Sequence, residues 1–257
     1  MIPAVIILLV TILAGTVGAD PRAANGQIFM PFVTGGASIP VSCDLPEKNY
    51  GTLSVHGPSQ TGDPESNANV NLGYRGWEPV TADHKLIAID ESGKDPKAPQ
   101  FPDMFADRRT ATISGTYMRY RWDWDCNCPV DLKSSEEVTV LGLAVQPGET
   151  IYTPDSDYNI GGGYEYQVTY AGDSGITLYI GLDDDYNGYV VHIEDVCVDP
   201  DLVELFRDLH DDGRKELPAL KGHQAFGKAL SGEIKVAVRD TGHFLDPRSR
   251  NDWWRGR

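Results

Sequence analysis

Short runs in which apolar and polar residues alternate dominate the second half of this 257-residue chain. Residues 164–170 place three tyrosines and a valine on one side, and residues 233–239 do the same with an isoleucine and two valines. Successive side chains of a β-strand point to opposite faces, so this spacing is typical of strands in a sheet. Residues 138–145 form a β-branched run, and residues 176–180 and 189–193 flank a turn-rich segment, which predicts a hairpin. The sequence therefore predicts a mostly β protein with an antiparallel sheet or sandwich.

One amphipathic helix is expected near residues 199–213. Asp199 is a favourable N-cap and Pro200 suits the first helical position. Gly213 is suited to end the helix. The apolar residues between them follow helical spacing and predict one buried stripe: Leu202, Leu205, Phe206 and Leu209.

The charge balance excludes two classes of partner. The chain has 38 Asp and Glu against 22 Lys and Arg, a formal net charge of −16. Such a charge repels phosphate backbones and anionic lipid surfaces, so we expect neither nucleic-acid binding nor a polybasic membrane contact. The 40% hydrophobic content is sufficient for a packed core.

The N-terminus predicts export from the cytoplasm. Residues 2–15 are apolar, and Val17 and Ala19 are small residues at the positions that signal peptidase recognises. We therefore expect residues 1–19 to be a signal peptide and the mature protein to be secreted, extracellular or at the cell surface, without a membrane attachment. The alternative is an uncleaved membrane anchor, because this stretch is just long enough to span a bilayer.

The four cysteines, Cys43, Cys126, Cys128 and Cys197, fit an oxidising compartment and predict disulfides. Cys126 and Cys128 have the spacing of neighbours on one face of a strand, so each is expected to pair with a distant cysteine. The pairing is then either 43–126 with 128–197 or 43–128 with 126–197. A zinc site is the weaker alternative, since no second Cys pair lies nearby.

Four segments, in this order, carry a family resemblance. Residues 147–154 read Pro-Gly-Glu-Thr-Ile-Tyr-Thr-Pro, and residues 188–193 read Gly-Tyr-Val-Val-His-Ile. Residues 221–227 read Lys-Gly-His-Gln-Ala-Phe-Gly, and residues 234–248 begin Ile-Lys-Val-Ala-Val-Arg-Asp and end Asp-Pro-Arg. With these segments, residues 136–254 resemble the M23 (LytM-like) peptidoglycan endopeptidase domain. The resemblance implies that family's antiparallel sheet.

The expected domain organisation follows from this resemblance. Residues 116–257 would form the M23-like β domain, and residues 20–115 an N-terminal region rich in strands and loops. Residues 57–69 and 91–103 contain many turn-forming residues and few apolar ones, so both are expected to be exposed loops.

The residues that the family uses for zinc are missing. The resemblance implies a His and an Asp four residues apart, where this chain has Val138 and Gly142, and a His-x-His pair, where it has Glu233-Ile234-Lys235. Only the general-base histidine is retained, as His192. Without the three protein ligands that a catalytic zinc needs, the resemblance implies no catalytic residue and no zinc cofactor.

The expected function is therefore non-catalytic. The former active-site groove, lined by His192, Glu233, Lys235 and Arg239, would bind cell-wall glycan or peptide, or the protein would assemble with other copies of itself on an extracellular surface. One alternative is an enzyme, either a divergent zinc metallopeptidase or a glycan hydrolase acting on the cell wall. Another is a calcium-stabilised extracellular structural protein.

Alternating tyrosines are candidates for stacking on a sugar. Tyr164, Tyr166 and Tyr179 lie in predicted strands, and flat aromatic rings suit the apolar faces of carbohydrates. The favoured alternative is that these rings belong to the core of the sheet, with hydroxyl groups reaching its rim.

A candidate calcium site lies at the turn before residue 188. Asp183, Asp185 and Asn187 occupy positions 1, 3 and 5 of the EF-hand loop template, which ends at Glu194. If residues 189–193 form a strand, Glu194 would lie roughly 20 Å away from the aspartates and would not close the loop. The favoured interpretation is therefore that these are acidic, solvated turns and that the protein has no cofactor, and a looser calcium site is the alternative.

Overall fold

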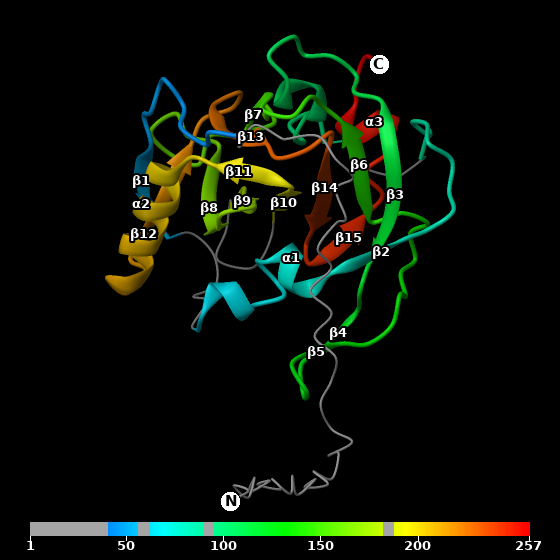
Figure 1. Cartoon of the computed structure of the whole chain (residues 1–257), viewed down its shortest axis with the longest axis horizontal. Coiled ribbons are helices and arrows are strands. Elements are labelled where there is room, and N and C mark those ends of the chain that lie inside the picture. Colours follow the sequence, from blue (N-terminus) through cyan, green and yellow to red (C-terminus); the bar gives the residue numbers. More distant parts are fainter. Residues whose placement is uncertain (1–40, 56–61, 90–94, 182–187) are drawn as a thin grey trace, which may run out of the picture. The chain divides into compact units, whose positions relative to one another are not determined.

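The structure is a computed structural model that describes residues 41–55, 62–89, 95–181 and 188–257 (Figure 1). The predicted signal peptide, residues 1–19, and the candidate calcium ligands Asp183, Asp185 and Asn187 lie outside the described residues. Within the described ranges, no helix is both long and apolar enough to cross a membrane.

Ten strands of the described chain form one sheet in which every pair is antiparallel. Its order is β1-β12-β8-β9-β10-β14-β6-β3-β2, and β15 also pairs with β14. The strands are β1 (Gly51–Ser54), β2 (Trp77–Pro79), β3 (Ile113–Arg119), β6 (Val140–Ala144), β8 (Tyr166–Ala171), β9 (Gly175–Tyr179), β10 (Tyr189–Glu194), β12 (Glu216–Leu220), β14 (Glu233–Asp240) and β15 (His243–Leu245).

Smaller elements complete the fold. A second antiparallel sheet has the order β11-β13-β7, and β4 and β5 form a separate hairpin. These strands are β7 (Thr150–Tyr152), β11 (Val196–Val198), β13 (Ala225–Ala229), β4 (Trp122–Asp123) and β5 (Cys128–Pro129). The helices are α1 (Leu72–Arg75), α2 (Pro200–Asp211) and α3 (Arg250–Trp253), with 3-10 turns η1 (Pro64–Ser66) and η2 (Phe101–Met104). The prediction of a mostly β, antiparallel protein is confirmed.

The predicted helix is confirmed as α2. Asp199 caps it, since one carboxylate oxygen accepts a hydrogen bond from the Asp201 amide at 3.0 Å. The other oxygen accepts from the Leu45 amide at 2.9 Å, which fastens the described N-terminal segment to the start of the helix. Leu202 and Phe206 bury the apolar stripe, and α2 packs on β8 and β12.

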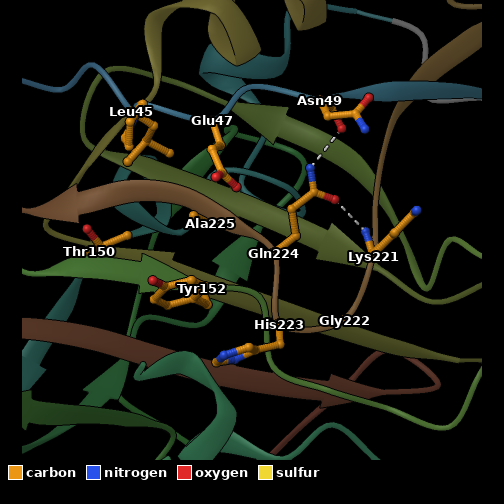
Figure 2. A pocket seen from close by; sticks show the side chains of 11 residues that line it. Leu45, Glu47, Asn49, Thr150, Tyr152, Lys221, Gly222, His223, Gln224 and Ala225 are labelled. Carbon is orange, nitrogen blue, oxygen red and sulfur yellow. Dashed lines mark hydrogen bonds between the residues drawn. The ribbon is translucent and has the colours of Figure 1, made fainter. Parts of the chain in front are cut away.

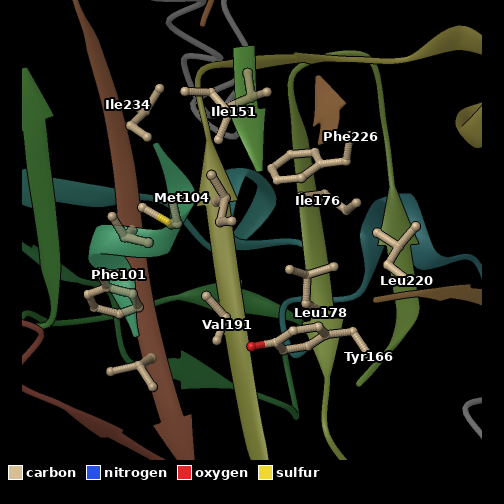
Figure 3. Packing of buried hydrophobic residues seen from close by; sticks show 14 of the residues in the cluster. Phe101, Met104, Ile151, Tyr166, Ile176, Leu178, Val191, Leu220, Phe226 and Ile234 are labelled. Carbon is tan, nitrogen blue, oxygen red and sulfur yellow. The ribbon is translucent and has the colours of Figure 1, made fainter. Parts of the chain in front are cut away.

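The main core lies on one face of the large sheet. Val191 and Ile193 of β10 point into it together with the inward side chains of the neighbouring strands. Figure 3 shows Phe101 and Met104 of η2 in this cluster, near Ile151 of the smaller sheet. Burying each of these side chains contributes about 1.5–3 kcal/mol, so the cluster is the main source of stability.

The opposite face of β10 and β14 is also covered, and the covering segment contains α1. Leu72 of this helix packs with Val140, Ala237 and Phe244 in a second, smaller cluster. The Thr177 hydroxyl of β9 donates a hydrogen bond to the Val70 carbonyl just before the helix. The chain therefore buries both faces of its central strands with its own residues.

The disulfides join Cys43 to Cys197 and Cys126 to Cys128, so both predicted pairing schemes are wrong. The prediction assumed that Cys126 and Cys128 lie in a strand, but Cys126 belongs to the turn between β4 and β5. Asn127 adopts a left-handed backbone with φ of 51°, and the Cα atoms of the two cysteines are 5.3 Å apart. Cys43 reaches β11 because the Leu45–Asp199 hydrogen bond holds its segment there.

Strands from both sides of residue 116 share the large sheet. β1 pairs with β12 and β2 pairs with β3, although the expected domain boundary places β1 and β2 in a separate region. The boundary itself falls within β3. The described residues belong to one compact unit.

Candidate functional site

The residues of the predicted groove lie on β10 and β14, on the face covered by the α1 segment. His192 is opposite Ala237 and only 1% exposed. Its Nδ1 atom is 2.9 Å from the Thr177 hydroxyl, and its ring stacks on Phe244. Burial, with the charges of nearby arginines, lowers the pKa of His192 well below its usual range, so the imidazole is neutral.

Arg239 contacts the same covering segment. Its guanidinium donates hydrogen bonds to the carbonyl oxygens of Asn69, at 2.9 Å, and Gly242, at 3.3 Å. His192 and Arg239 are therefore engaged by the chain itself and are not on an open groove.

Lys235 and Glu233 form an ion-pair cluster at the other end of β14. The Lys235 ammonium is 3.2 Å from Glu233 and also bonds to Asp195. It lies over the rings of Tyr117 and Trp77, at 5.3 and 5.6 Å from their centroids. Burial opposes its charge, but the two carboxylates outweigh that effect and raise the pKa of Lys235.

Glu233 stays ionised for a related reason. Burial alone would raise its pKa, but hydrogen bonds donated by Ser114, at 2.5 Å, and Tyr117, at 2.8 Å, together with Lys235, lower it. The cluster is therefore a fixed cation held between carboxylates.

Replacing Lys235 with methionine is expected to lower the free energy of unfolding by about 1–3 kcal/mol, because Glu233 and Asp195 would then face each other without a cation. Urea denaturation at neutral pH measures this loss. Lys85→Met is the matched control, since Lys85 and its partner Asp83 are both about two-thirds exposed and such pairs contribute little. An equal effect of the two substitutions would contradict the assignment.

Glu194, next to this cluster on β10, is a buried acid. It is 5% exposed and accepts a 3.2 Å hydrogen bond from the Gly73 amide of α1. Burial raises the pKa of Glu194 to about 8, and that effect outweighs the Gly73 hydrogen bond. Between pH 4.5 and 8 the folded protein therefore holds a proton that the unfolded chain releases, and the free energy of unfolding falls as the pH rises.

The variant Glu194→Gln is expected to be more stable than the wild type at pH 8.5 by roughly 2–4 kcal/mol and nearly equal to it at pH 4.5. Denaturant midpoints measured across this pH range test the prediction. The exposed Glu204→Gln on α2 is the control and should show no such trend. A stability difference that does not grow with pH would show that Glu194 ionises normally in the folded protein.

The three candidate sugar-stacking tyrosines lie in or beside the core. Tyr166 is fully buried in the main cluster and Tyr179 is 7% exposed. Tyr164 is half-buried, with its hydroxyl packed against Gly51. Tyr166 and Tyr179 are therefore core residues, and Tyr164 is partly exposed.

A different aromatic ring lines a solvent-open pocket of about 560 Å³ between the 45–49 segment, β7 and the 221–225 loop (Figure 2). The rings of Tyr152 and His223 stack there, 4.6 Å apart and inclined by only 13°. His223 has a left-handed backbone, with φ of 50°, and its Nδ1 atom is 2.6 Å from the Asp103 carbonyl. A non-glycine residue in this conformation is uncommon and often marks a functional position.

The wall of this pocket is fixed by Gln224. Its side-chain amide donates to the Asn49 carbonyl at 2.9 Å and accepts from the Lys221 amide at 2.8 Å (Figure 2). The side chains of Lys221 and Glu47 are exposed at the rim. An aromatic floor with polar and charged groups around it can hold a small polar ligand.

Sequence reasoning missed this pocket as a site. Residues 147–154 and 221–227 were noticed only for the family resemblance, and nothing in their order shows that Tyr152 and His223 stack. The useful signal would have been a histidine directly after a glycine in a predicted loop, as in Lys221-Gly222-His223.

The described residues show no metal centre. No group of three or more His, Cys, Asp or Glu side chains in the described ranges is arranged to hold a metal ion. The turn that follows Asp155 has the same Asp-x-Asp-x-Asn spacing as residues 183–187, but the Asn159 side chain accepts hydrogen bonds from the amides of Gly161 and Gly163. That oxygen is used to build the turn.

Comparisons with known proteins do not identify a function, so the proposed function depends on the geometry described above. Searches of family models, curated proteins and solved structures find no match to this chain.

Proposed function

We propose that this protein is a secreted, non-catalytic β protein that binds cell-wall glycan or peptide in the pocket between Tyr152, His223 and Lys221. The observation that carries the proposal is the stacked Tyr152–His223 pair lining a solvent-open pocket. A planar aromatic surface provides apolar contact for a sugar ring, and the polar rim provides hydrogen bonds. The Cys43–Cys197 disulfide is compatible with an extracellular location.

The resemblance to the M23 domain supports a role without catalysis. Gly142 of β6 and Lys235 of β14, which stand where the resemblance expects zinc ligands, are cross-strand partners. The residues at these positions do not fit a zinc ion, because Val138 and Gly142 have no side-chain donor atom and the Lys235 ammonium repels a cation. In this proposal, the Lys235 ammonium lies where the M23 resemblance implies the zinc ion.

Co-sedimentation of the full-length protein with insoluble peptidoglycan tests the proposal. We expect binding, and we expect no release of soluble fragments when zinc is added. Tyr152→Ala should weaken binding about tenfold, because it removes the stacking ring. Tyr74→Ala is the matched control, since Tyr74 is an exposed tyrosine on α1.

Two outcomes would overturn the proposal. Fragment release that depends on zinc would identify a peptidase, and an equal loss of binding in the two tyrosine variants would show that this pocket is not the site. Circular dichroism of both variants establishes that each is folded before binding is compared.

Assembly on an extracellular surface is a second candidate, favoured by an exposed aromatic group at the β4–β5 hairpin. Trp124 is 55% exposed and lies beside Trp122, whose ring is 5.1 Å from that of Tyr74. Exposed apolar groups of this kind commonly mark contacts between proteins. Sedimentation velocity of the wild type and Trp124→Ser tests it, and a monomer at all concentrations would exclude it.

A further inference from the structure

Three arginine side chains from different elements converge on one phenylalanine. The guanidinium carbons of Arg75 (α1), Arg119 (β3) and Arg239 (β14) lie 5.5, 4.9 and 5.1 Å from the centroid of the Phe244 ring. In a chain with a net charge of −16, such a concentration of positive charge is unexpected. The repulsion between these three cations must therefore be compensated by other contacts.

None of these three arginines forms an ion pair with a carboxylate of the described chain. All ion pairs among the described residues involve other lysine or arginine side chains. Arg75 and Arg239 donate mainly to backbone carbonyls, of Ala68 and Tyr120 in one case and of Asn69 and Gly242 in the other. These contacts hold the cluster in place without neutralising it.

Arg119 has even fewer hydrogen-bond partners for its guanidinium group. Its Nε and Nη1 atoms are buried and have no hydrogen-bond partner among the described residues, and the same holds for Nε of Arg239. Leaving a buried donor unpaired is costly, and more so when it belongs to a charged group. Burial, followed by repulsion from the neighbouring arginines, lowers the pKa of Arg75 to about 9 and that of Arg239 to about 10.

A solvent-open pocket of about 580 Å³ adjoins Arg119. Its lining includes Arg121, Lys133, His243, Ser134 and Phe244, and no Asp or Glu of the described chain. Two carboxylates bond to residues of this wall, Asp131 to the Arg121 guanidinium at 2.7 Å and Glu136 to the Ser135 hydroxyl at 3.2 Å, and neither contacts Arg119. Arg119 therefore brings a charge that no carboxylate pairs with to a pocket lined by further cations.

We propose that this pocket binds a small ligand through an oxyanion, either a carboxylate or a sulfate group, held by Arg119. The Arg119 guanidinium supplies a charge-assisted hydrogen bond to such a group where it lines the pocket, and the surrounding cations favour the negative charge. The volume suits a ligand of monosaccharide size, and Ser134 supplies a hydroxyl for its polar groups. The site shares no lining residue with the Tyr152 pocket, so it stands independently of the proposed function.

Isothermal titration of the full-length protein with glucuronate, sulfate and glucose, at one ionic strength set with sodium chloride, tests the proposal. We expect glucuronate or sulfate to bind at millimolar concentrations and glucose not to bind. Stronger binding of glucuronate identifies the ligand group as a carboxylate, and stronger binding of sulfate identifies it as a sulfate. Binding of neither anion, or equal binding of glucose, overturns the proposal.

Arg119→Met separates binding from stability. We expect it to weaken anion binding by about tenfold, because a charge-assisted hydrogen bond is lost. Its melting temperature without ligand should equal or exceed that of the wild type, because one of three mutually repelling cations is gone. A purely structural arginine would give the opposite result, a lower melting temperature with unchanged anion binding.

Two further variants control the experiment. Arg207→Met makes the same charge change on the exposed surface of α2, where Arg207 pairs with Asp173, and should leave anion binding unchanged. Arg119→Lys keeps the charge but loses the planar fork, so it should bind with intermediate affinity. Equal weakening in Arg119→Met and Arg207→Met would contradict the site.

Discussion

Replacing Arg248 with methionine is expected to lower the free energy of unfolding by about 3–5 kcal/mol. Arg248 is completely buried, and its guanidinium bonds to Asp246, which is 2% exposed, at 2.7 to 3.3 Å. The same guanidinium contacts Glu137 at 2.7 Å and the Asp83 carbonyl at 3.1 Å. Methionine would fill part of the space but leave the buried Asp246 carboxylate without its cation.

The C-terminal tryptophans depend on the same turn. Trp253 donates its indole N–H to the Asp246 carbonyl at 3.0 Å, and Trp254 donates to the Pro247 carbonyl at 2.9 Å. Disturbing the turn therefore also loosens two large buried rings of the main core. Tryptophan fluorescence during urea denaturation includes the signal of this region, because Trp253 and Trp254 are two of the five tryptophans.

Arg250→Met is the matched control for Arg248, because Arg250 is exposed two residues later. It should change the free energy of unfolding by less than about 0.5 kcal/mol. A second variant, Arg248→Met with Asp246→Asn, removes the uncompensated charge and should recover part of the loss. If Arg248→Met alone has no more effect than the control, the buried ion pair does not stabilise the fold.

Removing the Cys43–Cys197 disulfide by substituting both cysteines with serine is expected to cost about 2–5 kcal/mol. The bridge closes a loop between cysteines 154 residues apart, and opening it increases the conformational entropy of the unfolded chain. The segment around Leu45 would then be held to the start of α2 by non-covalent contacts alone, such as the Leu45–Asp199 hydrogen bond.

The second disulfide of the protein provides the control. Cys126 and Cys128 are two residues apart, so their bridge closes a very small loop and restrains the unfolded chain little. Replacing this pair with serine should therefore cost far less than replacing Cys43 and Cys197. Thermal unfolding of the two double variants without reductant measures the difference, and equal losses would contradict the loop-closure argument. Peptide mapping without reductant verifies the pairing.

Local patterns predicted the regular elements of this protein. Asp199 and Pro200 signalled the start of α2, and the alternation in residues 233–239 signalled β14, because both signals depend only on neighbouring residues. The covering of the central sheet was not predictable in this way. Leu72 of α1 meets Ala237 of β14 through the tertiary fold, and nothing in residues 62–80 indicates their position.

For the candidate sites too, local patterns were visible in the sequence but tertiary contacts were not. His192 was singled out in the sequence as the general-base histidine that the M23 resemblance retains, but its burial between Thr177 and Phe244 follows from packing. The cluster of Arg75, Arg119 and Arg239 combines residues from three distant parts of the chain. Arg239 was expected to line the predicted groove, but nothing in the sequence indicates that the three arginines meet. Sites assembled from distant segments have no local signature.

The two outermost strands of the large sheet bear on how the protein behaves at high concentration. β1 has four residues, and β2 has three and ends at Pro79, which has no amide hydrogen to donate to another strand. Short edges and an edge proline hinder the addition of a further chain through backbone hydrogen bonds. The folded protein is therefore expected to resist the addition of further strands at these two edges of its large sheet, which is the step that amyloid-like growth from them would need.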